Sequence, residues 1–178
     1  MEEIKKEKMA TVNIGDPTPD RKRRIVEVLY AFLEDKISIA ELSGVSRQDM
    51  YRMAEAGYVK YKHGRYEEAE KIFRSLIVLD HRNPYFHSMM AAIYQREGRL
   101  VEAIMEYDLS LKVNPEDVAV FVNRGEIYLR NHNYRRAAED FRSAILRDPK
   151  GSNLWANRAR SLVIALKRQL ERDVGKKK

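Results

Sequence analysis

Cysteine is absent from this chain of 178 residues. The sequence therefore excludes disulfide bonds, thiol catalysis and cysteine-ligated zinc. It also lacks any run of about 18 apolar residues, so we expect no membrane-spanning helix and no membrane insertion. The first sixteen residues, MEEIKKEKMATVNIGD, have no apolar stretch and are not expected to act as a signal peptide. These absences together lead us to expect a cytoplasmic protein.

Motifs that carry chemistry are missing as well. The chain contains no short motif typical of a phosphate, dinucleotide or serine-hydrolase site. Its four histidines are scattered, and no two of them stand four residues apart on one helix face, so a metal site is not predicted. Neighbouring carboxylates such as Glu67 and Glu68 fall on a solvated helix face, with no sign of a shared pocket. We therefore expect no enzyme, no metal and no cofactor.

Positive charge is concentrated at the C-terminal end of the sequence. The formal net charge is +7, and residues 151–178 carry eight basic and two acidic groups, whereas residues 25–150 carry 19 basic and 20 acidic groups. A role toward nucleic acid or acidic lipid would have to use that basic end. No aromatic residue is interleaved with the final Lys176, Lys177 and Lys178, so we interpret them as a solubilising end. A nucleic acid is not the expected partner.

A period of 34 residues runs from Met53 to Pro149. It repeats a turn residue, an alanine and an aromatic residue, in the three sets Gly64, Gly98, His132; Ala69, Ala103, Ala137; and Phe73, Tyr107, Phe141. A fixed 34-residue period with these residue types in phase is the signature of the tetratricopeptide repeat (TPR), a helical hairpin that stacks on its neighbours. The sequence therefore predicts an all-α protein, a TPR superhelix of three hairpins with an N-terminal helical extension and a C-terminal capping helix.

The boundaries follow from apolar periodicity and helix caps. We predict a mobile segment over residues 1–19, an N-terminal helical extension over 20–45, three repeats over 46–150, and a capping helix with a basic tail over 151–178. Asp20 is the expected cap of the first helix, which ends near Lys36. The repeats are expected as helix pairs at 47–63 and 66–80, 84–97 and 100–113, and 118–131 and 134–147. Gly64 and Gly98 are expected at positive φ, and His132-Asn133 replaces the glycine in the third repeat, where asparagine tolerates that conformation.

Consensus places of the repeat predict the core. These residues are Met53, Gly57, Phe73, Leu76, Met90, Ala91, Tyr94, Ala103, Tyr107, Phe121, Gly125, Tyr128, Ala137 and Phe141. The last helix is expected to bury a stripe formed by Leu154, Trp155, Leu162, Ile164 (or Val163), Leu166 and Leu170, and to present a polar outer face.

The first repeat carries a more specific pattern. Gly64, Tyr66, Ala69, Phe73, Leu76, Leu79 and Asp80 fill the pattern G-x-Y-x-x-A-x-x-x-F-x-x-L-x-x-L-D within GRYEEAEKIFRSLIVLDHRNPYF. This segment resembles the class II chaperones of bacterial type III secretion, and the resemblance covers about residues 25–150. It implies a cytoplasmic chaperone that holds a hydrophobic translocator subunit before export.

The first helix of each hairpin is expected to line the concave face. In the 34-residue frame, places 2, 5, 9, 12 and 13 point inward, and Ala54 and Ala92 are among the small residues at these places. Tyrosines offer large apolar contact with few rotors to order, which suits peptide binding. The predicted peptide-binding residues are Tyr51, Tyr58, Tyr61, Lys62, Tyr85, Gln95, Arg96, Val122, Glu126 and Arg130. The alternative for the tyrosines is packing against the N-terminal helix.

Self-association is predicted through the N-terminal helix. Val28, Leu29 and Phe32, with Ile25 and Leu33, form an apolar stripe wider than a short helix needs when one side is covered. The family resemblance points the same way, because related chaperones often dimerise through this helix. We expect a weak homodimer; the alternative is that the stripe packs onto the first repeat.

Three functions remain open on the sequence. The leading hypothesis is a chaperone that binds an extended, hydrophobic-anchored segment of a secreted translocator-type client in the concave groove. The second is a generic TPR scaffold that joins proteins in an assembly. The third is an adaptor to nucleic acid or a membrane surface through the basic C-terminal helix, which a steep salt dependence of binding would indicate.

Overall fold

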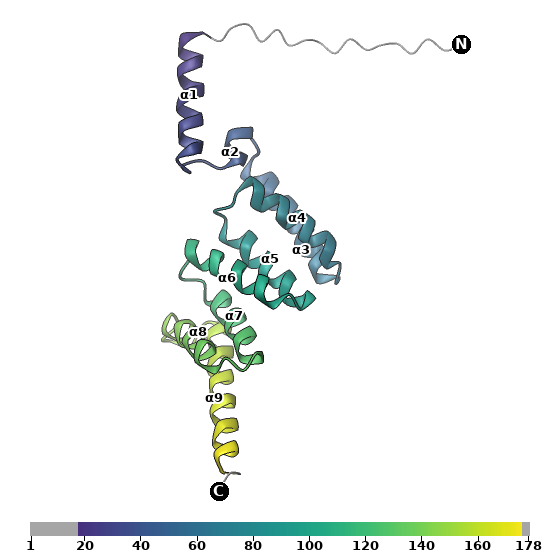
Figure 1. Cartoon of the computed structure of the whole chain (residues 1–178), viewed down its shortest axis with the longest axis vertical. Coiled ribbons are helices and arrows are strands. Elements are labelled where there is room, and N and C mark those ends of the chain that lie inside the picture. The colour runs from purple at the N-terminus through teal and green to yellow at the C-terminus, as the bar shows by residue number, and fades with distance from the viewer. Residues whose placement is uncertain (1–17, 176–178) are drawn as a thin grey trace, which may run out of the picture. The chain divides into compact units, whose positions relative to one another are not determined.

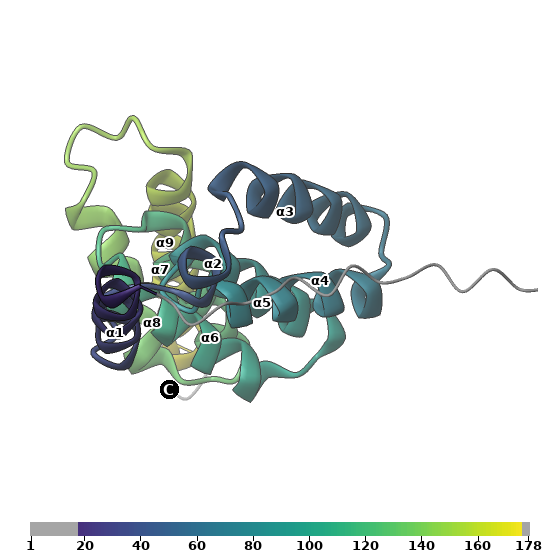
Figure 2. The same ribbon diagram turned by 90° about the horizontal axis from the view of Figure 1, so that it is seen from above.

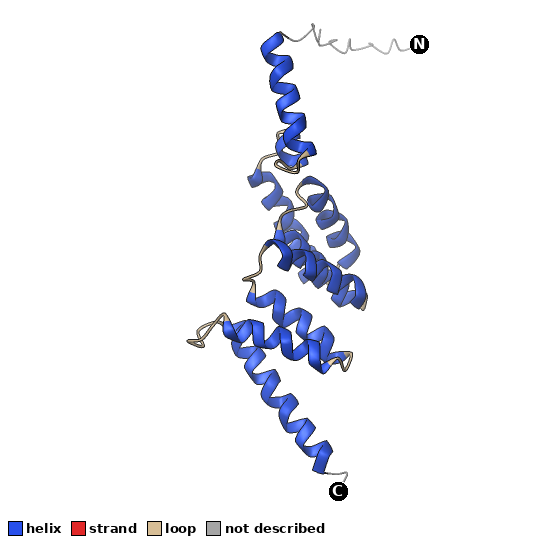
Figure 3. Cartoon of the chain, turned by 60° about the vertical axis from the view of Figure 1, so that its left-hand side comes forward, coloured by secondary structure: helices blue, strands red, loops and turns tan. Residues whose placement is uncertain are grey.

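The computed structural model describes the backbone of residues 18–175, and their side chains except those of residues 169, 170 and 172–175. All regular structure in this range is helical, as predicted, and it contains no strand (Figure 3). None of its helices is long and apolar enough to cross a membrane. Most of the segment predicted to be mobile, and the C-terminal lysines, lie outside the described residues. The nine helices in this range are α1 (Pro19–Leu33), α2 (Ile39–Ser43), α3 (Arg47–Lys62), α4 (Tyr66–Leu79), α5 (Pro84–Glu97), α6 (Leu100–Val113), α7 (Val118–Arg130), α8 (Tyr134–Leu146) and α9 (Leu154–Gly175).

The chain divides into two compact units, residues 1–37 and residues 38–178. The first unit contains α1, none of whose residues is buried. Thr18 caps this helix, because its hydroxyl accepts from the backbone N–H of Arg21 at 3.4 Å. The predicted cap, Asp20, is wrong by two residues and lies in the first turn instead. Pro19 occupies the first helical position, where its missing N–H costs least.

The second unit is a stack of helical hairpins that follow one another in chain order (Figure 1). It begins with α2, whose Ala40 is fully buried in the core of the first repeats. The helices α3 and α4 run side by side as the first hairpin (Figure 2), α5 and α6 form the second, and α7 and α8 the third. The bounds of these six helices agree with the predicted ranges to within one residue.

The 34-residue period reflects a close approach between the two helices of a hairpin, seen at glycines in the first and third hairpins. A Cβ atom added to Gly57 would lie 2.8 Å from the ring of Phe73, and one added to Gly125 would lie 2.7 Å from the ring of Phe141. Both aromatic rings are fully buried. The small residue on the first helix therefore makes room for the aromatic residue on the second, and any larger side chain would push the helices apart.

The helix α9 continues the repeat frame. Ala159 stands 34 residues after Gly125 and Ala156 stands 34 residues after Val122, and all four are buried. The helix packs against α7 and α8 and so occupies the place of a first helix in a fourth repeat. It does more than cap the array, because it extends the row formed by α3, α5 and α7.

The apolar stripe predicted for α9 is wrong for three of its six members, and Leu166 is half-buried. Leu154 is 84% exposed, Ile164 is 52% exposed and Trp155 is 40% exposed. Leu162 packs against the third-repeat core, as predicted, whereas the side chain of Leu170 lies outside the described residues. The stripe fails because the helix packs closely through alanines, which an analysis based on large apolar residues passes over.

Two smaller corrections concern the turn of the third repeat and the start of the first. Gly64 and Gly98 have φ of 75° and 79°, which confirms the prediction for these glycines. In the third repeat His132 takes the left-handed conformation with φ of 57°, whereas Asn133 caps α8 through its side-chain oxygen. Met53, predicted in the core, is exposed, and the buried methionine of that helix is Met50.

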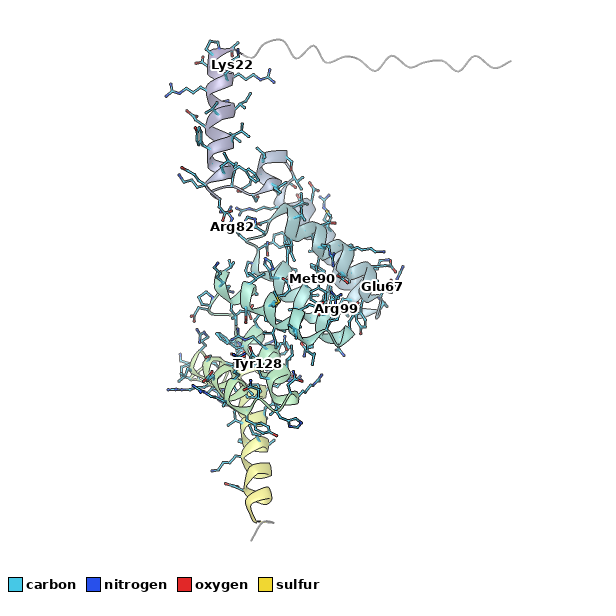
Figure 4. All side chains as sticks on the ribbon, in the orientation of Figure 1. Lys22, Glu67, Arg82, Met90, Arg99 and Tyr128 are labelled. Carbon is cyan, nitrogen blue, oxygen red and sulfur yellow. The ribbon has the colours of Figure 1, made fainter. Side chains whose placement is uncertain are left out.

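Charged side chains join helices both between hairpins and within a hairpin. The guanidinium of Arg99, which is labelled in Figure 4, lies 4.0 Å from the centroid of the Tyr94 ring and donates to Glu70 of α4 at 3.1 Å. The guanidinium of Arg124 on α7 donates to both carboxylate oxygens of the buried Asp140 on α8, at 2.9 and 2.6 Å. These contacts fix the rotation of each helix and therefore the direction in which its remaining side chains point.

Candidate peptide-binding site

A cavity of about 340 Å³ opens on the row of first helices. Its walls come from α3, α5, α7 and α9, and α6 contributes one residue. The lining residues are Tyr61, Ala92, Gln95, Arg96, Tyr107, Asn123, Glu126, Arg130, Trp155 and Arg158. Half of them were predicted as peptide-binding residues, namely Tyr61, Gln95, Arg96, Glu126 and Arg130. The structure brings these five together from three helices, although their role as peptide contacts stays a prediction.

The floor of the cavity offers hydrogen-bonding groups. The hydroxyl of Tyr107 donates to the side-chain oxygen of Gln95 at 2.9 Å. Burial raises the pKa of Tyr107, so this phenol remains a neutral donor. At the rim, Nε of Arg96 donates to the hydroxyl of Tyr61 at 3.4 Å, which joins the first helices of two repeats. Such hydrogen-bonding groups can orient a bound peptide backbone. Within the described residues, no cluster of three His, Asp or Glu side chains could hold a metal ion.

The wall at the third-repeat end comes from α9, and sequence reasoning missed it. Arg158 of α9 donates from Nε to Oε1 of Glu126 at 2.5 Å and from Nη2 to Oε2 at 3.0 Å. The same guanidinium lies 6.0 Å from the centroid of the Trp155 ring. Continuing the 34-residue frame beyond Gly125 to Ala159 would have placed α9 among the groove-lining helices. The repeat period predicted from the sequence ends at Pro149 and leaves α9 out.

Three exposed tyrosines on α3 and α5 form a cluster, called the aromatic group below. Tyr51, Tyr58 and Tyr85 are 55%, 42% and 39% exposed although they stand on well-packed helices. The ring centroids of Tyr58 and the cavity residue Tyr61 are 6.3 Å apart, so the aromatic group continues into the cavity. Burial of part of its surface, and the nearby Tyr58, raise the pKa of Tyr85. Lys62 belongs to the same surface, since its Nζ lies 5.7 Å from the centroid of the Tyr58 ring.

One predicted peptide-binding residue is wrong. Val122 is 0% exposed and packs in the core of the third repeat, so its side chain is not available to a ligand. Ala54 and Ala156, at the same place of the frame, are also buried. The side chain at this place of the repeat packs against the second helix of the hairpin. The glycine or alanine three positions later, where the two helices come closest, lies on the same side of the first helix. This side of the helix therefore faces the core of the hairpin and not the concave surface.

The predicted dimerisation residues lie on α1. Val28 and Leu29 are exposed and Phe32 is half-buried. The helix therefore presents apolar side chains that its own unit does not bury. The dimer itself stays a prediction.

Comparisons with known proteins agree with this architecture. A model of the tetratricopeptide repeat matches residues 122–169, a range that includes much of α9. The low calcium response locus protein H of Yersinia pestis is 32% identical over 79 residues, which are 44% of this chain and 47% of that protein. The curated relatives that are at least 30% identical align over 14% or 47% of their own length, so this chain spans less than half of each.

Solved structures extend the likeness over most of the fold. The structure of a type III secretion complex from Aeromonas hydrophila superposes with a TM-score of 0.74 at 27% identity, covering 82% of this chain and 98% of that one. The Yersinia enterocolitica chaperone SycD, in complex with a peptide of the translocator YopD, superposes with a TM-score of 0.65 at 22% identity, covering 70% and 97%.

The stacked hairpins and the 34-residue packing relation give this chain a tetratricopeptide-repeat fold, and the repeat model matches its residues 122–169. Within that class, its fold is the fold of the translocator chaperones of type III secretion. The predicted fold class and the resemblance found in the sequence are therefore confirmed.

Proposed function

We propose that this protein is a chaperone that binds an extended segment of a secreted, translocator-type client along the row of α3, α5, α7 and α9. The observation that carries the proposal is the continuity of the exposed tyrosines with the cavity through the contact of Tyr58 with Tyr61. The segment lies along the first helices, the client stays soluble before export, and the complex forms in the bacterial cytoplasm.

Tyr51 and Tyr85 contact the buried ring of Phe86, but these contacts leave part of each tyrosine ring exposed. Three tyrosines at 39–55% exposure leave apolar ring surface in contact with water, and covering that surface is favourable. Tyrosine is also among the residues that contribute most to protein interfaces, because it buries a large area with few rotors to order. A bound segment that places apolar side chains against these rings gains this free energy.

The relatives support the choice of client. The chaperone SycD was solved with a peptide of a translocator, and a second structure, PcrH, was solved with the chaperone-binding region of PopD. The corresponding segment for this chain would come from a translocator-type protein encoded in the same genome. The proposal names this class of client and no individual member of it.

The test is direct binding of short overlapping peptides that cover the translocator-type proteins of the same genome. Fluorescence anisotropy with the full chain identifies the tightest-binding peptide. The double variant Tyr51→Ala/Tyr58→Ala should lose about 2 kcal/mol or more of its binding free energy per anchor and keep its helical circular dichroism. The matched control is Tyr134→Ala, an exposed tyrosine on α8 outside the cavity, which should bind like the unmodified chain.

Two results would count against the proposal. If no translocator peptide binds, the scaffold function, in which the repeats join other proteins, takes its place. If peptides bind but the double variant and the Tyr134→Ala control bind equally well, the client uses another surface.

A further inference from the structure

A row of cations follows the first helices of the three repeats. Lys62, Arg96 and Arg130 are spaced by 34 residues, and each stands in the last turn of its helix, α3, α5 and α7 respectively. Because they hold the same place of the repeat frame, they lie on the same side of successive first helices. Arg96 and Arg130 line the cavity directly.

The cavity carries an excess of positive charge. Its lining includes three guanidinium groups, from Arg96, Arg130 and Arg158, and a single carboxylate, from Glu126. The formal charge of the lining is therefore three minus one, or +2. The apolar part of the lining comes from Ala92, Trp155 and the rings of Tyr61 and Tyr107. This end of the groove differs from the end at Tyr51, Tyr58 and Tyr85, where aromatic surface dominates.

The single carboxylate in the cavity lining already has a cationic partner. Glu126 accepts from Arg158 through both of its oxygens. Arg96 donates to a neutral phenol, the hydroxyl of Tyr61. Arg130 is exposed, and in the described part of the chain neither it nor Arg96 has a carboxylate partner. Two guanidinium groups thus face the cavity without a counter-charge.

Helix stability alone explains part of this arrangement. A cation in the last turn of a helix is stabilised by the helix dipole, and this applies to Lys62, Arg96 and Arg130. It does not apply to Arg158, which stands near the beginning of α9, where the dipole disfavours a cation. The dipole also gives no reason for guanidinium groups from α5, α7 and α9 to converge on one cavity.

We propose that this cavity binds carboxylate side chains of the client, so that the recognised segment is acidic at one end and apolar at the other. The inference rests on the proposed function and names the chemistry of its client. Arginine pairs with a carboxylate through two parallel hydrogen bonds, a geometry that a lysine cannot provide. The bound segment also excludes water, and this strengthens charge pairing that would be weak on an open surface.

The proposal fixes the orientation of the client. Its apolar side chains lie against the tyrosines of α3 and α5, and its Asp or Glu side chains lie at Arg96 and Arg130. An extended chain advances about 3.3 Å per residue and packed helices are about 10 Å apart, so about three residues separate contacts with successive first helices. An acidic residue should therefore follow the apolar anchors at a short distance in the segment.

The experiment uses the tightest-binding translocator peptide and a copy in which every Asp and Glu is replaced by Asn and Gln. The full chain should bind the neutral copy about tenfold more weakly or worse, and the difference should shrink as salt is added. The variants Arg96→Gln and Arg130→Gln should lose affinity for the acidic peptide and none for its neutral copy. Arg142→Gln is the matched control, because Arg142 is an exposed arginine of α8 outside the cavity.

A charge exchange sharpens the test. The variant Arg130→Glu should bind a peptide with Lys in place of its acidic residues better than it binds the acidic original. Equal affinity of the unmodified chain for the acidic peptide and its neutral copy would overturn the inference and leave the proposed function intact. If Arg130→Gln loses stability but keeps its affinity for the acidic peptide, Arg130 only stabilises the end of its helix. That result would also overturn the inference. Failure of every peptide to bind would instead reject the proposed function.

Discussion

Arg158 of α9 and Glu126 of α7 form a two-point ion pair across the end of the groove, with N–O distances of 2.5 and 3.0 Å. Glu126 is 9% exposed, whereas the side chain of Arg158 is largely exposed. The pair therefore satisfies a buried carboxylate with a cation that reaches it from the surface. It fixes α9 against the third repeat and shapes the wall of the cavity.

Removing Arg158 should leave that carboxylate buried without its partner. We expect Arg158→Ala to lower the free energy of unfolding by about 1–3 kcal/mol, measured by urea denaturation at neutral pH. The double variant Arg158→Ala/Glu126→Gln should recover part of the loss, because a neutral amide is less costly to bury than a carboxylate. If the single variant is as stable as the unmodified chain, the pair does not hold α9 in place.

The close approach within the third hairpin predicts a second effect. Gly125→Ala should destabilise the protein by about 1–3 kcal/mol, because the added methyl group would meet the ring of Phe141 at 2.7 Å. Helix propensity acts in the opposite direction, since alanine is favoured over glycine by about 1 kcal/mol. Thermal or urea unfolding of Gly125→Ala, Phe141→Leu and the double variant provides a mutant cycle, and the double variant should be less destabilised than the sum of the two. Additive losses would mean that the two residues do not compete for the same space.

The contacts of His87 predict a pH-dependent stability. This buried residue places Nδ1 at 2.7 Å from the carboxylate of Glu106 and Nε2 at 2.8 Å from the carbonyl of His81. A carboxylate and a carbonyl only accept hydrogen bonds, so both ring nitrogens must donate and the ring carries a proton on each. The hydrogen bond to Glu106 raises the pKa of His87 above its ordinary value, against the effect of burial, which lowers it.

The sign of the pH effect follows from this raised pKa. The folded protein holds the proton more tightly than the unfolded chain, whose histidine pKa is about 6.5. The stabilising contribution is therefore complete below about pH 6.5 and is lost as the pH rises through the folded pKa. Unfolding free energies of the unmodified chain and His87→Gln should differ most below about pH 6.5 and converge at higher pH. The exposed His63→Gln is the control and should follow the unmodified chain, and a constant difference for His87→Gln would contradict the prediction.

The apolar side chains of α1 predict self-association. The full chain should sediment as a weak homodimer at micromolar concentration, and removal of residues 1–36 should leave a monomer. Leu29→Asp should have the same effect in the full chain, because it places a charge among the exposed apolar residues of the helix. Arg21→Asp, at an exposed charged position of the same helix, is the control. A strictly monomeric full chain would exclude the dimer and leave α1 without this role.

The sequence alone determined the helices and their pairing. Apolar periodicity, and Gly64 and Gly98 in the turns, are local signals, and each depends on a few neighbouring residues. The spacing of 34 residues added the stacking of hairpins, because a repeated small residue and a repeated aromatic residue imply the same packing each time. The agreement of the helix bounds to within one residue in the repeats follows from these signals.

Only the tertiary structure decided which side chains face the groove. Val122 and Glu126 stand one helical turn apart, and both were placed in the groove by the repeat frame. Packing puts Val122 in the core and leaves Glu126 at the cavity. The rotation of a helix about its axis depends on the close contacts with its neighbours, here on the approach of Gly125 to Phe141, and no local pattern records it. For the same reason Trp155 reaches the wall of the cavity, since α9 packs through its alanines and turns its larger side chains outward.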